Sequence, residues 1–265
     1  MCKMKLLLKL IYNGRNFMGY QYQPDVRTVQ GTLTSAVSAC FGRDMKITGC
    51  SRTDAGVHAL GFCCTAEPAG EHPDDWLRIP VGKVHRALSR FLPEDIAVAG
   101  ESEVPDDFHP RYSVVSKEYI YRMYDTVGED PFLCGRAWHL KHPVTDDGLA
   151  RMNEAAAYLI GYHDFSSFMA SGSKIEDARR TVESLSVIRD GHMLTLSVRA
   201  DGFLYNMVRI ITGTLTDCAH GTIDPAEMGR ILDTRDRCAA GKTAPADGLY
   251  LNDVTYGFPV EWKLY

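Results

Sequence analysis

The feature that most restricts the fold is an order of strand and helix patterns that occurs twice along the chain. In the first half, residues 3–12 alternate between apolar and polar side chains, as a half-buried strand does. Apolar residues at helical spacing follow over residues 29–41, and Gly42 is placed to end that helix. The order is β-α-β-β-α-β, the split-βαβ or ferredoxin-like pattern. The remaining elements of this half are expected over residues 45–50, 57–65, 84–91 and 96–104.

The second half repeats the order with one additional helix. A strand rich in Tyr and Val is expected over residues 113–124, and a helix is expected to begin near the capping residue Thr145. The dipeptide Asp190-Gly191 is a strong hairpin signal between two further strands. The other expected elements are strands over 181–189, 193–199 and 249–256, a helix over about 203–220 and a short helix after Pro225.

Two such units predict an α+β protein with two ferredoxin-like (split βαβ) domains. The boundary is expected in the charged segment that holds Pro105 and Pro110, which gives domains of residues 1–104 and 105–265. A chain of 265 residues is long enough for each domain to bury a core. Two sheets side by side leave a central cleft, which is a usual site for a ligand.

Composition excludes several classes of protein. The eight Cys residues form no Cys-x-x-Cys pair, so zinc-ligand spacing is absent and a reducing cytoplasm is expected. Lys9 interrupts the apolar run near the N-terminus, so we expect neither a signal peptide nor a transmembrane span. The net charge of −5 argues weakly against a nucleic-acid-binding protein, but phosphate contacts depend on local charge.

The loop Arg52-Thr53-Asp54-Ala55-Gly56 lies between two expected strands and holds the strongest candidate for a reactive group. Loops on a rigid scaffold commonly present such groups, and Gly56 lets the backbone approach a ligand. The alternative is a plain turn in which Asp54 hydrogen-bonds its own backbone. His58 borders this loop and is either a functional residue or one that orients the turn.

Three further residues have two possible roles each. Tyr119 and Tyr121 share one face of a strand, either as core rings or as a platform on which an RNA base stacks. Arg209 lies inside an apolar helix, where it either reaches solvent or pairs with an acid such as Asp54. An exposed Asp with arginines, aromatic rings and no metal pattern suits an Asp nucleophile or base that acts on a base or a sugar.

These segments resemble the tRNA pseudouridine synthase A family. The string Arg52–Ala59 is similar to the catalytic signature of the family, and Tyr12–Gln21 is similar to its opening loop. The resemblance extends over nearly the whole chain. Further matching segments follow in family order at residues 92–98, 106–113, 164–168, 207–209 and 244–251.

The resemblance implies isomerisation of uridines at positions 38–40 in the anticodon stem-loop of tRNA to pseudouridine. It implies two α+β domains that share an extended antiparallel or mixed sheet with a central cleft. It also implies a cytoplasmic homodimer whose two subunits bind one tRNA, with no metal, no organic cofactor and no membrane.

The resemblance also assigns the site residues. Asp54 matches the catalytic Asp and is predicted to be the nucleophile at C1′, with removal of the 2′ proton as the alternative. Arg52 matches an Arg that pairs with Asp54 and keeps it ionised. Tyr119 matches a Tyr that contacts the target base, and Arg209 matches an Arg near the Asp. The predicted substrate-binding residues are Tyr119, His58 and Tyr121.

Two positions depart from the family pattern. Tyr20 stands where the family usually has Trp, and Phe62 follows Gly61 where the family usually has Gln. One alternative is an RNA-binding or RNA-folding module without isomerase activity, which mapping of pseudouridine in the anticodon arm would distinguish. A hydrolase that uses Asp54 ranks last, because the sequence shows no oxyanion or metal partner.

Overall fold

The computed structural model describes residues 4–70, 76–172 and 175–265 and divides into two compact units. Unit 1 consists of Met1–Val115 together with Leu251–Tyr265, and unit 2 consists of Ser116–Tyr250. In sequence, unit 2 is therefore inserted between two segments of unit 1. Both units combine helices with strands, so the predicted α+β class is confirmed. The domain boundary between residues 104 and 105 and the shared sheet remain predictions.

Unit 1 has the predicted β-α-β-β-α-β order. The strands lie side by side in the order β4, β1, β3, β2, and each is antiparallel to its neighbour. Short β11 pairs with the outer edge of β4, and the Leu251–Tyr256 part of β10 lies beside β3. The elements are β1 (Met4–Tyr12), α1 (Val29–Phe41), β2 (Met45–Gly49), β3 (His58–Pro68), α2 (Val84–Leu88), β4 (Ile96–Pro105), β10 (Leu249–Tyr256) and β11 (Lys263–Leu264).

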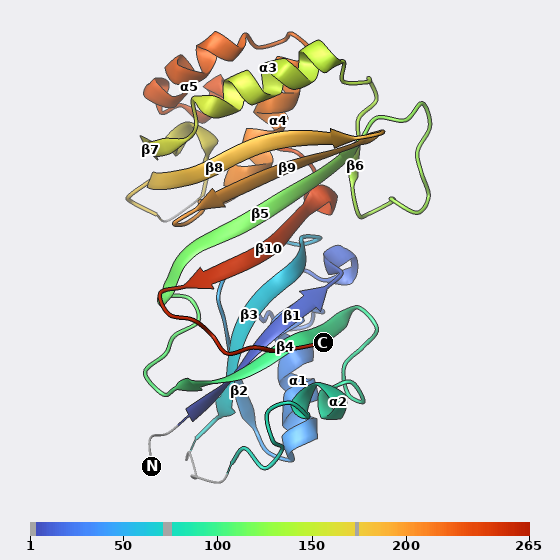
Figure 1. Ribbon diagram of the computed structural model, residues 1–265, viewed down its shortest axis with the longest axis vertical. Coiled ribbons are helices and arrows are strands. Elements are labelled where there is room, and N and C mark those ends of the chain that lie inside the picture. The colour runs from blue at the N-terminus through green and yellow to red at the C-terminus, as the bar shows by residue number, and fades with distance from the viewer. Residues whose placement is uncertain (1–3, 71–75, 173–174) are drawn as a thin grey trace. The chain divides into compact units, whose positions relative to one another are not determined.

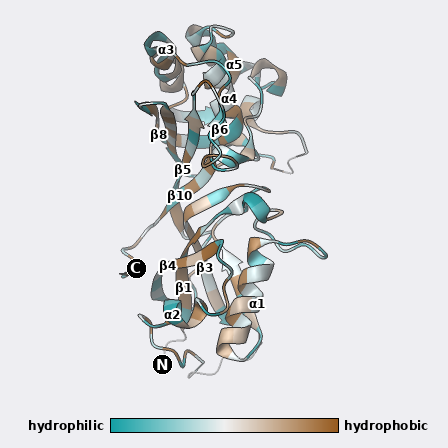
Figure 2. Cartoon of the chain, turned by 90° about the vertical axis from the view of Figure 1, so that its right-hand side faces the viewer, coloured by the Kyte–Doolittle hydropathy of each residue, from teal (hydrophilic) through white to brown (hydrophobic). Residues whose placement is uncertain are grey.

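The core of unit 1 is centred on β1. Leu6, Leu8 and Leu10 are fully buried on the face that the alternation predicted, and Figure 2 shows hydrophobic residues along β1 and β3. Leu7 is also fully buried, although it lies on the face of Lys5 and Lys9. A central strand is buried on both faces. Alternation of apolar and polar residues alone does not distinguish a central strand from an edge strand.

The ends of α1 follow from its sequence. The Thr28 hydroxyl accepts a hydrogen bond from the Gly31 N–H at 3.2 Å, which satisfies one of the free donors of the first turn. Gly42 ends the helix in the left-handed conformation at φ 67°, as predicted. Both caps fix where α1 begins and ends, and therefore where the following strand β2 starts.

Unit 2 contains the strands and helices expected for the second half except the closing strand, of which only Leu249 and Tyr250 belong to it (Figure 1). It also has two short strands that were not predicted, β6 and β7. The strands β5, β9, β8 and β7 lie side by side, each antiparallel to its neighbour, and α3 packs against β8 and α4. Thr145 caps α3 as predicted, with its hydroxyl 3.0 Å from the Gly148 N–H. The elements are β5 (Val114–Tyr124), β6 (Trp138–His139), α3 (Asp146–Ala157), β7 (Gly161–Asp164), β8 (Arg179–Asp190), β9 (Met193–Ala200), α4 (Met207–Ala219) and α5 (Met228–Thr234).

The helix expected over 203–220 begins later than predicted, at Met207. Asn206 has φ 60° and ψ 10°, the left-handed conformation, which a right-handed helix does not accept. Asn is one of the few residues other than Gly that adopts this conformation readily. The apolar residues Phe203 and Leu204 therefore belong to the loop that leads into α4, and hydrophobic periodicity did not reveal this boundary.

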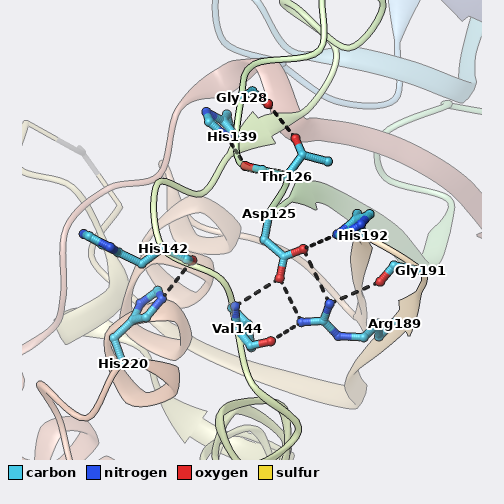
Figure 3. Close-up of polar contacts among 10 residues, drawn as sticks. All are labelled: Asp125, Thr126, Gly128, His139, His142, Val144, Arg189, Gly191, His192 and His220. Atoms are coloured by element: carbon cyan, nitrogen blue, oxygen red, sulfur yellow. Dashed lines mark hydrogen bonds and ion pairs between the residues drawn. The ribbon is translucent and has the colours of Figure 1, made fainter.

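A buried carboxylate joins three segments of unit 2 (Figure 3). Asp125, at the end of β5, is 4% exposed and accepts hydrogen bonds from Arg189 Nη2 and from the Val144 N–H, both at 3.0 Å. His192 Nδ1 lies 3.4 Å from the same carboxylate. Burial alone would raise the pKa of Asp125, but hydrogen bonds from Arg189 and Val144 outweigh burial and hold the pKa below its ordinary value.

We expect Asp125→Asn to lower the free energy of unfolding at pH 7 by about 3 kcal/mol, because it leaves Arg189 half-buried without its carboxylate. The pKa of Asp125 is lowered in the folded state, so its contribution is complete above the ordinary Asp pKa of about 3.9 and disappears as the pH falls through the lower folded-state pKa. Urea unfolding at pH 7 and at several acidic pH values measures both effects. Asp190→Asn, an exposed change on the same hairpin, is the control. Equal losses in the two variants would contradict this role for Asp125.

Candidate active site

The Asp54 loop joins β2 to β3 and is fixed through Thr53. The Thr53 carbonyl accepts a hydrogen bond from the Tyr20 N–H at 3.0 Å, and the hydroxyls of Thr53 and Tyr12 lie 2.9 Å apart. Thr53 is buried, whereas the next residue, Asp54, is half-buried. The Val57 N–H donates to the Asp54 carbonyl at 3.2 Å and closes the turn. The backbone on both sides of Asp54 is therefore held in place.

The opening loop packs directly on the Asp54 loop, backbone against backbone. Gly19 has φ 90°, and a Cβ atom there would lie 2.9 Å from the Thr53 carbonyl oxygen. A Cβ atom on Gly14 would lie 1.9 Å from the Val57 carbonyl oxygen. No residue with a side chain fits at either position without moving one of the loops. The two segments that carried the sequence resemblance thus form one structural unit.

The segment 92–98, which matched the family pattern, anchors the opening loop. Arg27 donates two hydrogen bonds to the Asp95 carboxylate, at 2.7 and 2.9 Å, and its guanidinium lies 4.1 Å from the centre of the Phe17 ring. The Asn13 N–H donates to the Asp95 carbonyl at 2.9 Å. Arg27 was not predicted as a site residue, because a single Arg in a loop carries no pattern that identifies its partner.

His58 is 1% exposed, and its ring is part of this packing. Its Nδ1 accepts a hydrogen bond from the Gly14 N–H at 3.0 Å, so Nδ1 carries no proton. His58 therefore helps to hold the opening loop on the turn, and its predicted contact with substrate stays a prediction.

The two departures from the family pattern lie against each other. The rings of Tyr20 and Phe62 stack with centres 4.4 Å apart and an interplanar angle of 29°. Phe62 also contacts Tyr12, whose ring centre is 5.7 Å away. The Tyr20 hydroxyl is buried and has no hydrogen-bond partner among the described residues. Burial raises the pKa of Tyr20 well above its ordinary value, so the hydroxyl stays neutral.

Arg52, two residues before Asp54, is exposed. The predicted pairing of its guanidinium with Asp54 stays a prediction.

Tyr119 and Tyr121 occupy one face of β5 in unit 2, as predicted. Tyr121 is fully buried, its hydroxyl donates to the Pro245 carbonyl at 2.7 Å, and burial raises its pKa strongly. Tyr121 is thus part of the core of unit 2, and its predicted contact with substrate stays a prediction. The Tyr119 ring is 6% exposed and packs edge-to-face on Phe203, with ring centres 4.9 Å apart.

Arg209 lies in the first turn of α4 and is half-buried. Its Nε donates to the Ala244 carbonyl at 2.7 Å, and its Nη1 donates to the Asn206 side-chain oxygen at 2.8 Å. These two bonds fix the guanidinium and also support the left-handed backbone of Asn206. The predicted site residues thus form two groups, with Arg52, Asp54 and His58 in unit 1 and Tyr119, Tyr121 and Arg209 in unit 2.

Among the residues that the structure describes, no three His, Cys, Asp or Glu side chains are grouped as metal ligands would be. In the same part of the chain, no helix combines the length and apolar character needed to cross a bilayer.

Comparison with known proteins gives consistent matches. Residues 10–113 and 155–257 match a family model described as tRNA pseudouridine synthase. The tRNA pseudouridine synthase A of Halalkalibacterium halodurans is 44% identical over 243 residues, which is 91% of this chain and 89% of the relative. That of Acetivibrio thermocellus is 39% identical over 256 residues, covering 97% and 100%. A chain of a Cbf5-Nop10-Gar1 complex matches at a TM-score of 0.36 and 10% identity, over 93% of this chain and 58% of the other.

We expect His58→Leu to destabilise the fold by about 1–3 kcal/mol, because the buried Gly14 N–H loses its acceptor. His58→Asn is the matched control, since its side-chain oxygen can accept from Gly14. Urea unfolding and hydrogen exchange of the Gly14 amide measure the effect. A Gly14 amide that keeps its protection in the Leu variant would contradict the assigned bond.

Two Tyr→Phe variants are expected to have opposite effects on stability. Tyr20→Phe removes a buried hydroxyl without a partner and should raise the free energy of unfolding by about 1 kcal/mol. Tyr12→Phe removes the hydroxyl that lies 2.9 Å from Thr53 Oγ1 and should lower it by about 1 kcal/mol. Urea unfolding of the two variants checks the signs, and a loss of stability in Tyr20→Phe would show that its hydroxyl is bound.

Proposed function

This chain belongs to the tRNA pseudouridine synthase family, and we propose that Asp54 is the residue that begins its isomerisation of uridine to pseudouridine in tRNA. The single observation that carries the assignment is the fixed backbone around Asp54. Thr53 is bound by Tyr12 and Tyr20, and the turn is closed by Val57, so the half-buried carboxylate has a defined position. Catalysis benefits when a reacting group is held in place before substrate binds.

The chemistry fits a carboxylate at this position. In the reaction the bond between C1′ and N1 of uridine breaks, the uracil turns, and a bond between C1′ and C5 forms. C5 then loses its proton and N1 takes up a proton, so the product is an isomer of uridine. A stacked base is inaccessible, so the nucleotide must first leave the helix. Attack by Asp54 on C1′ releases uracil with the electron pair of the broken bond, and attack by C5 on C1′ then releases the carboxylate. Removal of the 2′ proton would also require an ionised Asp54.

Arg52 is proposed to support that ionised state. Its exposed guanidinium lies two residues from Asp54, and a nearby cation favours the charged form of a carboxylate. The pairing is proposed for the complex with RNA, because attraction between the two charges increases when water is excluded from the loop.

Tyr119 and Arg209 are proposed to act on the detached uracil and on the region around Asp54, as the family resemblance implies. These proposed roles are supported by the fixed positions of the two side chains. The Tyr119 ring is fixed against Phe203, and two hydrogen bonds fix the Arg209 guanidinium. We assign Tyr119 a stacking role, because an ordinary Tyr with a pKa of about 10 is a poor base at neutral pH.

The same proposal has three further parts. The modified region is the anticodon stem-loop, the active form is a cytoplasmic homodimer, and the reaction needs no cofactor. They are supported by the resemblance along nearly the whole chain. Mapping of pseudouridine on bulk tRNA with and without the enzyme tests the first, and light scattering of the purified protein tests the dimer.

We expect Asp54→Asn to reduce pseudouridine formation by at least about 10⁴-fold, because loss of an essential catalytic group has effects of this size. The affinity for an anticodon stem-loop RNA should stay within about threefold, since one carboxylate adds little to RNA binding. Tritium release from RNA labelled at uridine C5 measures the reaction. Asp44→Asn removes the same charge from an exposed position in unit 1 and is the control. Activity of Asp54→Asn within tenfold of the wild type would refute the assignment. An RNA-binding module without isomerase activity would show no tritium release even in the wild type.

A further inference from the structure

The residue that precedes α4, Asn206, has an unusual backbone conformation. Its φ of 60° and ψ of 10° lie in the left-handed region, which Asp25 and Arg235 alone share with it among the described residues other than Gly. Residues in sparsely populated conformations are concentrated at functional sites, where the surrounding structure holds them in place. Asn206 is therefore a candidate for a role beyond the start of a helix.

The Asn206 side chain does not cap the helix that it precedes. Asn is among the preferred residues at this position, where its side-chain oxygen usually accepts a hydrogen bond from a backbone N–H two or three residues later. Within the described part of the chain, the Asn206 side chain makes no such bond to α4. Its oxygen accepts instead from Nη1 of Arg209 at 2.8 Å. The acceptor is thus used for a side chain of the first turn and not for its backbone.

A second hydrogen bond holds the same guanidinium from another segment. Arg209 Nε donates to the Ala244 carbonyl at 2.7 Å, and the Ala244 N–H donates to the Arg209 carbonyl at 3.0 Å. The segment before Ala244 packs directly on α4, since a Cβ atom on Gly213 would lie 1.8 Å from the Lys242 carbonyl oxygen. A single bond at Nε leaves the planar guanidinium free to turn about that bond, and the bond from Nη1 to Asn206 removes this freedom.

The loop that ends at Asn206 also holds Tyr119. The Phe203 ring packs edge-to-face on the Tyr119 ring, with ring centres 4.9 Å apart. The Met207 N–H donates to the Leu204 carbonyl at 3.1 Å, so the chain turns sharply at Asn206 and enters α4 directly. One left-handed residue therefore links the loop behind Tyr119 to the helix that carries the guanidinium.

We propose that Asn206 is a positioning residue for the isomerisation, in that its left-handed backbone and its side-chain oxygen set the direction of the Arg209 guanidinium. The proposal rests on the function proposed above, in which Arg209 acts on the region around Asp54. A guanidinium that is directed before substrate binds needs no reorganisation during the reaction. The benefit therefore falls on the rate of the chemical steps and not on the affinity for RNA.

Two substitutions of Asn206 separate its side chain from its backbone. Asn206→Gly accepts the left-handed conformation but removes the oxygen, whereas Asn206→Asp tolerates this conformation and keeps an oxygen acceptor. We expect kcat of Asn206→Gly to fall by about 10- to 100-fold, with KM within about threefold, because a misdirected group is felt in the transition state. Asn206→Asp should keep kcat within about fivefold. Tritium release from anticodon stem-loop RNA labelled at uridine C5 gives both constants. A Gly variant with the wild-type kcat would show that only the backbone matters and would overturn the proposal.

The guanidinium itself provides a measurement that does not depend on activity. The NMR signals of the two Arg209 Nη nitrogens, identified by their loss in Arg209→Lys, report rotation about the bond between Nε and Cζ. This rotation should be at least about tenfold faster in Asn206→Gly than in the wild type, because a hydrogen bond to a charged group no longer opposes it. Asn206→Asp should restore slow rotation. Rotation in the wild type as fast as in free arginine would overturn the proposal without any variant.

A second substitution tests whether Asn206 acts through Arg209. Arg209→Lys has no Nη1, so the addition of Asn206→Gly should lower its kcat by less than about twofold further. Equal losses in the two backgrounds would mean that Asn206 acts elsewhere. Arg235→Gly replaces another left-handed residue of unit 2, with φ 52°, and is the control. It should keep kcat within about twofold, since Gly adopts this conformation without strain. Urea unfolding establishes that each variant is folded.

The outcomes distinguish this proposal from the proposed function. A wild-type protein that forms no pseudouridine overturns the proposed function, and an Arg209→Lys variant with the wild-type kcat overturns the role proposed for Arg209. In either case the Nη signals of Asn206→Gly still decide whether Asn206 directs the guanidinium. Unchanged Nη signals in an active enzyme overturn the positioning role alone.

Discussion

The contact on which the candidate site depends is the packing of two glycines against a turn. Gly14 and Gly19 allow the opening loop to approach the backbone at Val57 and Thr53 more closely than any side chain would permit. Hydrogen bonds to Thr53 and His58 then lock the approach. The position of Asp54 therefore depends on Gly14, Gly19, Thr53 and His58. We propose no step of the reaction for these four residues.

The Tyr20–Phe62 pair shows how a departure from a family pattern can be absorbed. Each residue alone would appear to weaken the site, because one replaces a larger ring and the other replaces a polar side chain. In the fold the two rings stack on each other. The cost is a buried Tyr hydroxyl without a partner among the described residues. Stability at this position therefore comes from apolar packing instead of polar contacts.

Much of the fold was predictable, and the misses have physical causes. Caps such as Thr28, Gly42 and Thr145 act locally, so the sequence predicted where α1 and α3 begin or end. The start of α4 depends on the left-handed Asn206, which Arg209 supports through a tertiary contact. For the site, the motif around Asp54 was recognisable. The sequence offered two roles for His58 without deciding between them and gave no sign of the anchor at Arg27, because each depends on a partner distant in sequence.

The insertion of unit 2 within unit 1 has a consequence for synthesis on the ribosome. The first 115 residues emerge before unit 2, yet β11 and the Leu251–Tyr256 part of β10, which also belong to unit 1, are made only after residue 250. Unit 2 is continuous in sequence and is complete as soon as Tyr250 has been made. Unit 1 therefore receives its last two strands only after the whole of unit 2 has been synthesised.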